Sequence, residues 1–252
     1  MAEDKKPAGN ENFSWSQFDS ESYFQHYYGE PHPDDDKVIA RACAAFQAAK
    51  PEGGLLKTID VGTGPNLFPL FVALPRASHI TAWEYATSNV EWLKRELAEN
   101  TMRPQWQHFW HVTREAYGPK IDLPANPIPV LREKAEIQNG SVYDLPERQW
   151  DAATMFFCAE SITEQHSQFQ AACIRYARCV RPGGALIAAF LVGSSGYEVA
   201  ERPFPVLNVS DADIREVFSK VSTDIHTEPI GIVEREIRSG YSGFVFLTAT
   251  AT

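Results

Sequence analysis

The segment that decides the fold is Ile59-Asp60-Val61-Gly62-Thr63-Gly64-Pro65-Asn66. An apolar run at 55–61 leads into it, and apolar residues at helical spacing follow it at 66–74. Glycines in a strand-to-helix turn let the backbone approach a ligand closely. Open α/β sheets bind ligands beyond the carboxyl ends of their strands. We therefore predict a ligand-binding loop here, with a plain tight turn as the alternative.

This loop also argues against two common nucleotide sites. Leu67 occupies the third glycine position of the dinucleotide-binding pattern G-x-G-x-x-G, so the pyrophosphate cradle is incomplete. No lysine follows the glycines at the spacing of a P-loop. The loop therefore indicates a ligand without a pyrophosphate.

Strand-like and helix-like segments alternate outward from this loop. Such alternation predicts a doubly wound α/β fold with a mostly parallel sheet. The last two strand-like segments, 222–234 and 241–248, follow each other closely and predict one reversed C-terminal strand. Other expected strands are 55–61, 79–85, 136–142, 150–157, 185–192 and an extended segment at 203–209. Expected helices are 66–74, 88–100, 164–180 and 211–220, the last one capped by Ser210.

The N-terminal part of the chain differs from this core in composition. Residues 1–12 are polar and charged, which predicts a disordered tail without a signal segment. Residues 13–54 hold seven aromatic side chains by residue 28, followed by a helix that starts at Asp34. We expect this segment to form a helical lid over the core, which then spans 55–252.

Composition restricts the class of partner. The chain has 252 residues, a formal net charge of −10 and 44% hydrophobic residues, enough for a sizeable core. Nucleic acids and anionic lipids bind proteins that carry an excess of Lys and Arg. We therefore expect a small-molecule substrate, no nucleic acid or membrane partner, and a monomer or weak dimer.

The cysteines indicate a reducing compartment. None of the four belongs to a CxxC pair or a His cluster, so we expect buried free thiols and no metal site. This pattern favours a cytoplasmic protein. The longest apolar run, 185–192, has the length of a strand and is too short to span a bilayer. The four are Cys43, Cys158, Cys173 and Cys179.

Three further motifs end strands of the predicted sheet. Glu84 ends the second strand, where an acid can accept hydrogen bonds from both ribose hydroxyls of a nucleoside. Asn139-Gly140-Ser141-Val142 follows the third strand, and a simple turn is its alternative. Phe156-Phe157-Cys158-Ala159-Glu160-Ser161 ends the fourth strand. Its carboxylate could bind an amine, act as a base, or only cap the following helix.

Together these segments resemble the nicotinamide, phenylethanolamine and indolethylamine N-methyltransferases, a family of class I, Rossmann-like methyltransferases. The resemblance extends from about Phe18 to Phe246. It is carried by Phe18-Asp-Ser-Glu-Ser-Tyr23-Phe-Gln-His-Tyr27-Tyr28, by the glycine loop, by Arg181-Pro-Gly-Gly and by Pro205-Val-Leu-Asn-Val-Ser210. It implies S-adenosylmethionine as cofactor and S-adenosylhomocysteine as product.

The resemblance also implies a set of cofactor-binding residues. Tyr23 and Tyr28 would close over the cofactor, and Glu84 would take the place of the family's ribose-binding aspartate. Phe68 and Ser141 depart from the family's tyrosine and acidic residue, so two polar contacts are lost. The full set is Tyr23, Tyr28, Asp60, Gly62, Thr63, Gly64, Phe68, Glu84, Tyr85, Asn89, Ser141, Val142 and Phe156.

The acceptor pocket implied by the resemblance is rich in aromatic residues. Its members would be Trp15, Phe18, Tyr27, Phe157, Glu160, Ser161, Ser194 and Tyr197. Glu160 is the expected catalytic base, with Tyr27 and His26 as other candidates, although His26 is more often a surface residue. Phe190 replaces the aspartate of nicotinamide-type enzymes, and Ser239-Gly240-Tyr241 replaces an acidic pair of phenylethanolamine-type enzymes.

Three functions remain open at this point. The first is methyl transfer to a small aromatic or heterocyclic metabolite, with an amine nitrogen as the expected target. The second is C- or O-methylation of an aromatic scaffold such as an indole alkaloid or a diketopiperazine. The third is a noncatalytic module that only binds the cofactor.

Overall fold

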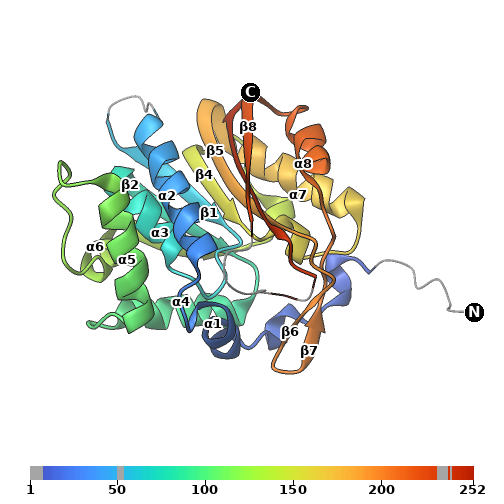
Figure 1. Ribbon diagram of the computed structural model, residues 1–252, viewed down its shortest axis with the longest axis horizontal. Coiled ribbons are helices and arrows are strands. Elements are labelled where there is room, and N and C mark those ends of the chain that lie inside the picture. Colours follow the sequence, from blue (N-terminus) through green and yellow to red (C-terminus); the bar gives the residue numbers. More distant parts are fainter. Residues whose placement is uncertain (1–7, 50–53, 232–237, 239) are drawn as a thin grey trace, which may run out of the picture.

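A computed structural model describes residues 8–49, 54–231, 238 and 240–252 of the chain. Its centre is a seven-stranded sheet in the order β3-β2-β1-β4-β5-β9-β8 (Figure 1). β9 is antiparallel to both of its neighbours, and β1 to β5 are parallel. The predicted doubly wound sheet with one reversed C-terminal strand is therefore confirmed. The strands are β1 Leu56–Val61, β2 Ala77–Glu84, β3 Ala135–Asn139, β4 Trp150–Phe156, β5 Val180–Val192, β8 Ser222–Ile230 and β9 Gly243–Ala251.

Helices cover both faces of the sheet, and each face has its own hydrophobic core. One core lies beneath α2 Pro33–Ala48, α3 Phe68–Ala73, α4 Thr87–Ala98, α5 Pro104–Tyr117 and α6 Ile128–Lys134. The other lies beneath α7 His166–Cys179 and α8 Asp211–Phe218. The Ser210 hydroxyl accepts a hydrogen bond from the Asp213 N–H, so α8 has the predicted capping box. All four cysteines are buried and free, as expected.

Several short elements connect these layers or precede the core. A two-stranded hairpin, β6 Tyr197–Val199 with β7 Arg202–Phe204, packs its aromatic residues against Phe18. No helix among the described residues is long and apolar enough to cross a lipid bilayer. The short 3-10 helices are η1 Asn10–Asn12, η2 Trp15–Gln17, η3 Leu74–Arg76, η4 Val142–Asp144 and η5 Ala159–Ser161.

Residues 8–12 have a defined structure, although their polar composition predicts disorder. The Ala8 N–H donates to Glu164 Oε2 at 2.8 Å, and Asn10 Nδ2 donates to the Ile162 carbonyl at 3.0 Å. These bonds fasten the segment beside the start of α7. Residues 8–12, expected to be disordered, therefore pack on the core, and residues 1–7 of the expected tail lie outside the described part of the chain.

The lid helix α1 Ser20–Tyr28 is docked on α4 and α5 by both apolar and charged contacts. Phe24 is fully buried, with its ring 5.5 Å from Trp92 and 4.9 Å from Trp106. Glu21 accepts hydrogen bonds from Trp92 Nε1 at 2.9 Å and from Arg103 Nη1 at 2.7 Å. This contact with Arg103 holds the pKa of Glu21 low, at about 2. The helix therefore has a fixed orientation above the edge of the sheet.

Candidate active site

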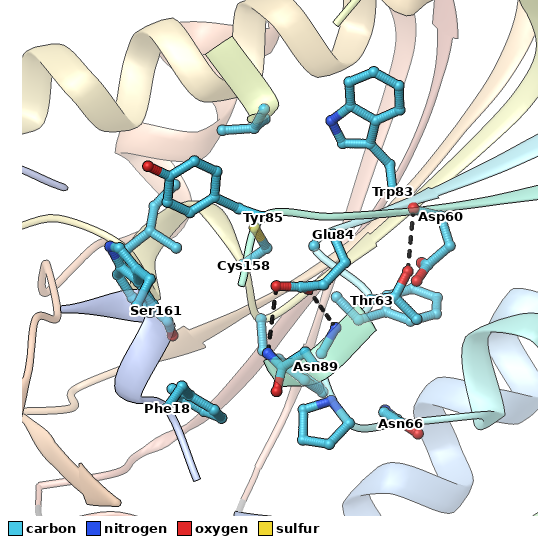
Figure 2. Close-up of a pocket in the computed structure, with 18 of the residues that line it drawn as sticks. Phe18, Asp60, Thr63, Asn66, Trp83, Glu84, Tyr85, Asn89, Cys158 and Ser161 are labelled. Carbon is cyan, nitrogen blue, oxygen red and sulfur yellow. Dashed lines mark hydrogen bonds between the residues drawn. The ribbon is translucent and has the colours of Figure 1, made fainter. Parts of the chain in front are cut away.

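A cavity lies where the parallel strands β1, β2 and β4 end, beneath the lid helix. Figure 2 shows the polar side chains that enter it from the glycine loop and from Glu84. The carboxyl ends of neighbouring parallel strands meet at one edge of a sheet, which explains why residues far apart in sequence converge here. This is the edge that the glycine loop predicts.

The backbone of the glycine loop is fixed by its glycines. Gly62 has a φ of +70°, and a Cβ at this position would lie 2.2 Å from Cys158 Sγ. Its N–H donates to the Trp83 carbonyl at 2.8 Å, which ties the loop to β2. Gly64 has a φ of +61°, but the atom nearest to its Cβ position, the Gly62 carbonyl oxygen, is 3.9 Å away. Gly62 is therefore required by conformation and space, and Gly64 by conformation alone.

Glu84 joins the loop to the first turn after β2. Its Oε2 accepts from the Gly64 N–H at 2.8 Å, and its Oε1 accepts from the Ala86 N–H at 2.7 Å and from Asn89 Nδ2 at 3.3 Å. Burial raises the pKa of this carboxyl above its usual value, while the three hydrogen bonds oppose the rise. A carboxylate has about four lone-pair sites, so it can still accept from a ligand. Its position fits a ligand hydroxyl.

Asp60 is a buried carboxyl group with one unused oxygen. Its Oδ1 accepts from the Thr154 hydroxyl at 2.6 Å, whereas Oδ2 has no partner in the structure. Burial raises the pKa of Asp60 to about 7, against the hydrogen bonds from Thr154 and Thr63. An unpaired buried oxygen costs free energy, and a cationic ligand group would remove that cost. Asp60 lines the cavity, so the structure suits an ammonium there.

The other end of the cavity has an aromatic lining. Trp15 and Phe18 come from the N-terminal segment, and their ring centroids are 6.4 Å apart. Tyr23 from the lid helix meets Tyr197 from the β6–β7 hairpin edge to face at 6.4 Å. Phe157 closes the wall from the end of β4. Flat aromatic groups of a ligand would fit between such rings.

Arg238 is the functional candidate that sequence reasoning missed. Its side chain is 6% exposed and lines the cavity beside Tyr197, whose ring centroid is 4.1 Å from Cζ. Nη1 donates to the Ser161 hydroxyl at 2.9 Å, and Nη2 donates to the Tyr23 hydroxyl at 3.3 Å. The one signal in the sequence is its neighbour, Ser239-Gly240-Tyr241, at the place of an acidic pair in phenylethanolamine-type enzymes, and it does not point to the arginine itself.

Most of the predicted residues do line this cavity. On the cofactor side they are Tyr23, Tyr28, Asp60, Gly62, Thr63, Gly64, Glu84, Tyr85, Asn89, Ser141, Val142 and Phe156. On the acceptor side they are Trp15, Phe18, Phe157, Ser161 and Tyr197. Asn66, the last residue of the glycine-loop motif, also lines the cavity, and further lining residues that the sequence did not single out include Asn10, Pro69, Trp83, Tyr143 and Ile162.

Glu160, expected to contact the acceptor, is not among the residues that line the cavity. Its carboxyl group is fully buried, and Oε1 accepts from the Leu191 N–H at 3.1 Å, while Oε2 has no partner in the structure. Burial raises the pKa of Glu160 to about 7, although the hydrogen bond from Leu191 and the charge of Arg238 lower it. The end of a strand gives the correct edge of the sheet but not the side of the backbone to which a side chain turns.

Other expected residues also lie outside this cavity. Phe68 is fully buried and stacks on Phe156 at 5.6 Å, so it supports the wall from behind. Ser194 is buried and does not line the cavity. Tyr27 and the exposed His26 line an adjoining groove instead. Phe190 packs between Phe169 and Phe218 in the core, where a charged residue could not be accommodated.

Comparison with known families gives one match over almost the whole chain. The model of the NNMT/PNMT/TEMT family matches residues 7–250. Phenylethanolamine N-methyltransferase from Bos taurus is 26% identical over 227 residues, which cover 83% of this chain and 79% of the relative. Nicotinamide N-methyltransferase from Sus scrofa is 22% identical over 204 residues, which cover 76% of each.

Solved structures support the same fold. Magnesium protoporphyrin IX methyltransferase from Synechocystis PCC 6803, with bound S-adenosylhomocysteine, gives a TM-score of 0.57 at 12% identity, covering 92% of this chain and 94% of that one. The 1,6-didemethyltoxoflavin-N1-methyltransferase from Burkholderia thailandensis gives a TM-score of 0.54 at 13% identity, covering 92% and 86%. At these identities the likeness concerns the fold alone.

The glycine loop generates a prediction about stability. Gly62→Ala should lower the free energy of unfolding by about 2–4 kcal/mol, because a left-handed backbone and a steric clash act together. Gly64→Ala is the matched control and should cost about 1–2 kcal/mol, because only the backbone conformation is unfavourable there. Urea denaturation followed by circular dichroism measures both. Equal losses in the two variants would contradict the steric role of Cys158.

Proposed function

The chain belongs to the NNMT/PNMT/TEMT family of S-adenosylmethionine-dependent methyltransferases, and we propose that it methylates a small aromatic or heterocyclic acceptor, at a nitrogen in the first instance. The observation that carries the proposal is the composition of the cavity. One end holds the glycine loop with Asp60 and Glu84, and the other end is walled by Trp15, Phe18 and other aromatic rings. We propose that the polar end binds the methyl donor, S-adenosylmethionine, and that the aromatic end binds a flat methyl acceptor.

We assign residues at the polar end of the cavity to individual groups of the cofactor. The unpartnered Oδ2 of Asp60 supports pairing with the ammonium of the cofactor's amino-acid part. We assign Glu84 to hydrogen bonds with the ribose hydroxyls, because it lines the cavity next to Gly64, and no atom lies closer than 3.9 Å to the Cβ position of that glycine. Tyr85 and Val142 line the same cavity, and Tyr23 and Tyr28 enter it from α1; we assign all four to contacts with the cofactor.

Methyl transfer from S-adenosylmethionine depends more on the positioning of the acceptor than on acid–base catalysis. When bound, S-adenosylmethionine supplies a methyl group already activated by the positive charge on sulfur. The chain's residues would hold the acceptor in line with that group. Such positioning can lower the activation barrier of a reaction by up to about 7–11 kcal/mol. The aromatic walls exclude water. The acceptor's lone pair would form the new bond as the carbon–sulfur bond breaks, and a nitrogen acceptor would release its proton to solvent.

Methylation at carbon or oxygen is the second candidate. The carboxylates among the described residues that line the cavity, Asp60 and Glu84, both belong to the glycine-loop end. The aromatic end instead holds Arg238 and the hydroxyl groups of Tyr23 and Ser161. This arrangement offers a protonated alkylamine no counter-ion, which favours acceptors that are uncharged or anionic at the reacting atom.

A turnover experiment tests the proposal. The purified protein should transfer an isotope-labelled methyl group from S-adenosylmethionine to at least one aromatic compound in a metabolite library, as detected by mass spectrometry. Product analysis then separates attack at nitrogen, carbon and oxygen. Tight cofactor binding without turnover on any aromatic acceptor would support the noncatalytic module and contradict the proposal.

Asp60 makes cofactor affinity dependent on pH. The raised pKa of about 7 means that Asp60 must lose a proton before it pairs with an ammonium. Affinity for S-adenosylhomocysteine should therefore increase roughly tenfold from about pH 6 to about pH 8 and then level off. Asp60→Asn should bind more weakly at the higher pH and lose this slope, as isothermal titration calorimetry would detect. Asp122→Asn, at an exposed position, is the control. A slope that persists in Asp60→Asn would exclude Asp60 as the titrating group.

Glu84 should contribute to affinity through its charge. Glu84→Gln retains the shape but weakens hydrogen bonds from ribose hydroxyls, so the dissociation constant of S-adenosylhomocysteine should rise roughly 10- to 100-fold. Glu136→Gln is the matched control, because this carboxylate is exposed on β3. Thermal unfolding without cofactor separates a loss of affinity from a loss of stability. Unchanged affinity in Glu84→Gln would remove Glu84 from the cofactor site.

A further inference from the structure

Arg238 combines deep burial with incomplete pairing. It forms no ion pair with any carboxylate in the part of the chain that the structure describes. Its Nε atom is buried and has no hydrogen-bond partner. Buried arginines are normally paired, because a guanidinium withdrawn from water loses strong hydration. This guanidinium therefore has donor capacity that the protein itself leaves unused.

The groups around Arg238 are suited to hold it but not to neutralise it. The rings of Tyr197 and Tyr27 lie 4.1 Å and 5.1 Å from Cζ, so the cation is flanked by aromatic faces. Ser161 and Tyr23 accept its hydrogen bonds through neutral hydroxyls. Of the described acids, Glu160 is turned toward the Leu191 N–H, and Asp35 lines the small inner cavity together with Arg238 without forming an ion pair with it. Among the residues that the structure describes, none neutralises this charge, which leaves it able to bind an anionic group of a ligand.

Arg238 also lies where three cavities adjoin. It lines the main cavity, the adjoining groove that contains Tyr27 and His26, and a small inner cavity behind Phe157. Neither the groove nor the inner cavity is lined by a residue of the glycine loop. A ligand group that meets Arg238 therefore lies at the aromatic end of the site, away from Asp60 and Glu84.

From this geometry we infer that the acceptor carries an anionic oxygen, in the first place a carboxylate, which binds the Arg238 guanidinium while its aromatic ring lies in the cavity that Phe18, Phe157 and Tyr197 line. The inference rests on the proposed function and specifies its substrate class. The guanidinium plane matches a carboxylate, and hydrogen bonds between charged groups are the strong ones. The same charge repels a protonated amine at this place.

Three probes of similar size test the inference on the whole protein saturated with S-adenosylhomocysteine. Phenylacetate is an anion, phenylacetamide is neutral and phenethylamine is a cation. Phenylacetate should bind at least about tenfold more tightly than phenethylamine, with phenylacetamide between them, as measured by ligand-detected NMR. Phenylacetate binding no better than phenethylamine, or no binding of any probe, overturns the inference.

Variants then assign the preference to one side chain. Arg238→Gln should weaken phenylacetate binding roughly 10- to 100-fold and leave phenylacetamide almost unchanged. Arg238→Lys keeps the charge without the planar fork and should lose part of the affinity. Arg178→Gln is the charge-matched control, because this arginine is exposed on α7. If Arg238→Gln does not fold, Arg238→Lys and the wild-type probe series still decide the matter.

The cofactor titration separates the possible failures. S-adenosylhomocysteine should bind wild type and Arg238→Gln with the same affinity. If Arg238→Gln weakens S-adenosylhomocysteine as much as phenylacetate, the guanidinium binds the cofactor's own carboxylate, and the inference is overturned. If wild type does not bind S-adenosylhomocysteine, the proposed function fails. If it does bind but discriminates none of the probes, only the inference about the acceptor fails.

Discussion

The site depends on the close contact between the glycine loop and the end of β4. Gly62 can turn back toward β2 because it carries no Cβ, and the space that a Cβ would need is occupied by Cys158. The turn brings the Gly62 N–H to the Trp83 carbonyl and the Gly64 N–H to Glu84. Three strands are thereby locked at one edge, and the walls of the cavity follow from their fixed spacing. A looser loop would leave Glu84 and Asp60 without defined positions.

This locked edge extends to the lid through a chain of polar contacts. Glu84 accepts from Asn89 Nδ2, and Asn89 Oδ1 accepts from the Ser20 hydroxyl at 2.7 Å, at the first residue of α1. The helix is held further along by Glu21 and by the buried ring of Phe24. The orientation of Tyr23 and Tyr28 above the cavity is therefore coupled to the same carboxylate that we assign to the ribose. If Glu84 binds the ribose as proposed, the cofactor and the helix α1 are linked through Asn89.

The sequence alone predicts the fold well because its signals are local. Hydrophobic alternation and the glycine turn identify β1, β2 and β4, and a capping box marks the start of α8. The polar end of the site follows, since Asp60 and Glu84 end strands whose order the fold class defines. The charged groups at the aromatic end could not be predicted in this way. Glu160 turns to the backbone of Leu191, and Arg238 reaches the cavity from a distant segment, which no local pattern reports.

The distribution of charge links both ends of the cavity to the reaction. Carboxylates lie at the glycine loop, where we place the ammonium of the cofactor, and Arg238 lies at the aromatic end, where we place the acceptor. Transfer of a methyl cation moves positive charge toward Arg238, and this is unfavourable in a water-poor cavity if the acceptor is neutral or cationic. An acceptor carboxylate that pairs with Arg238 cancels the repulsion in advance. Under the inferred assignment, only acceptors that bring their own negative charge avoid this penalty, so the residue that binds the substrate would also select it.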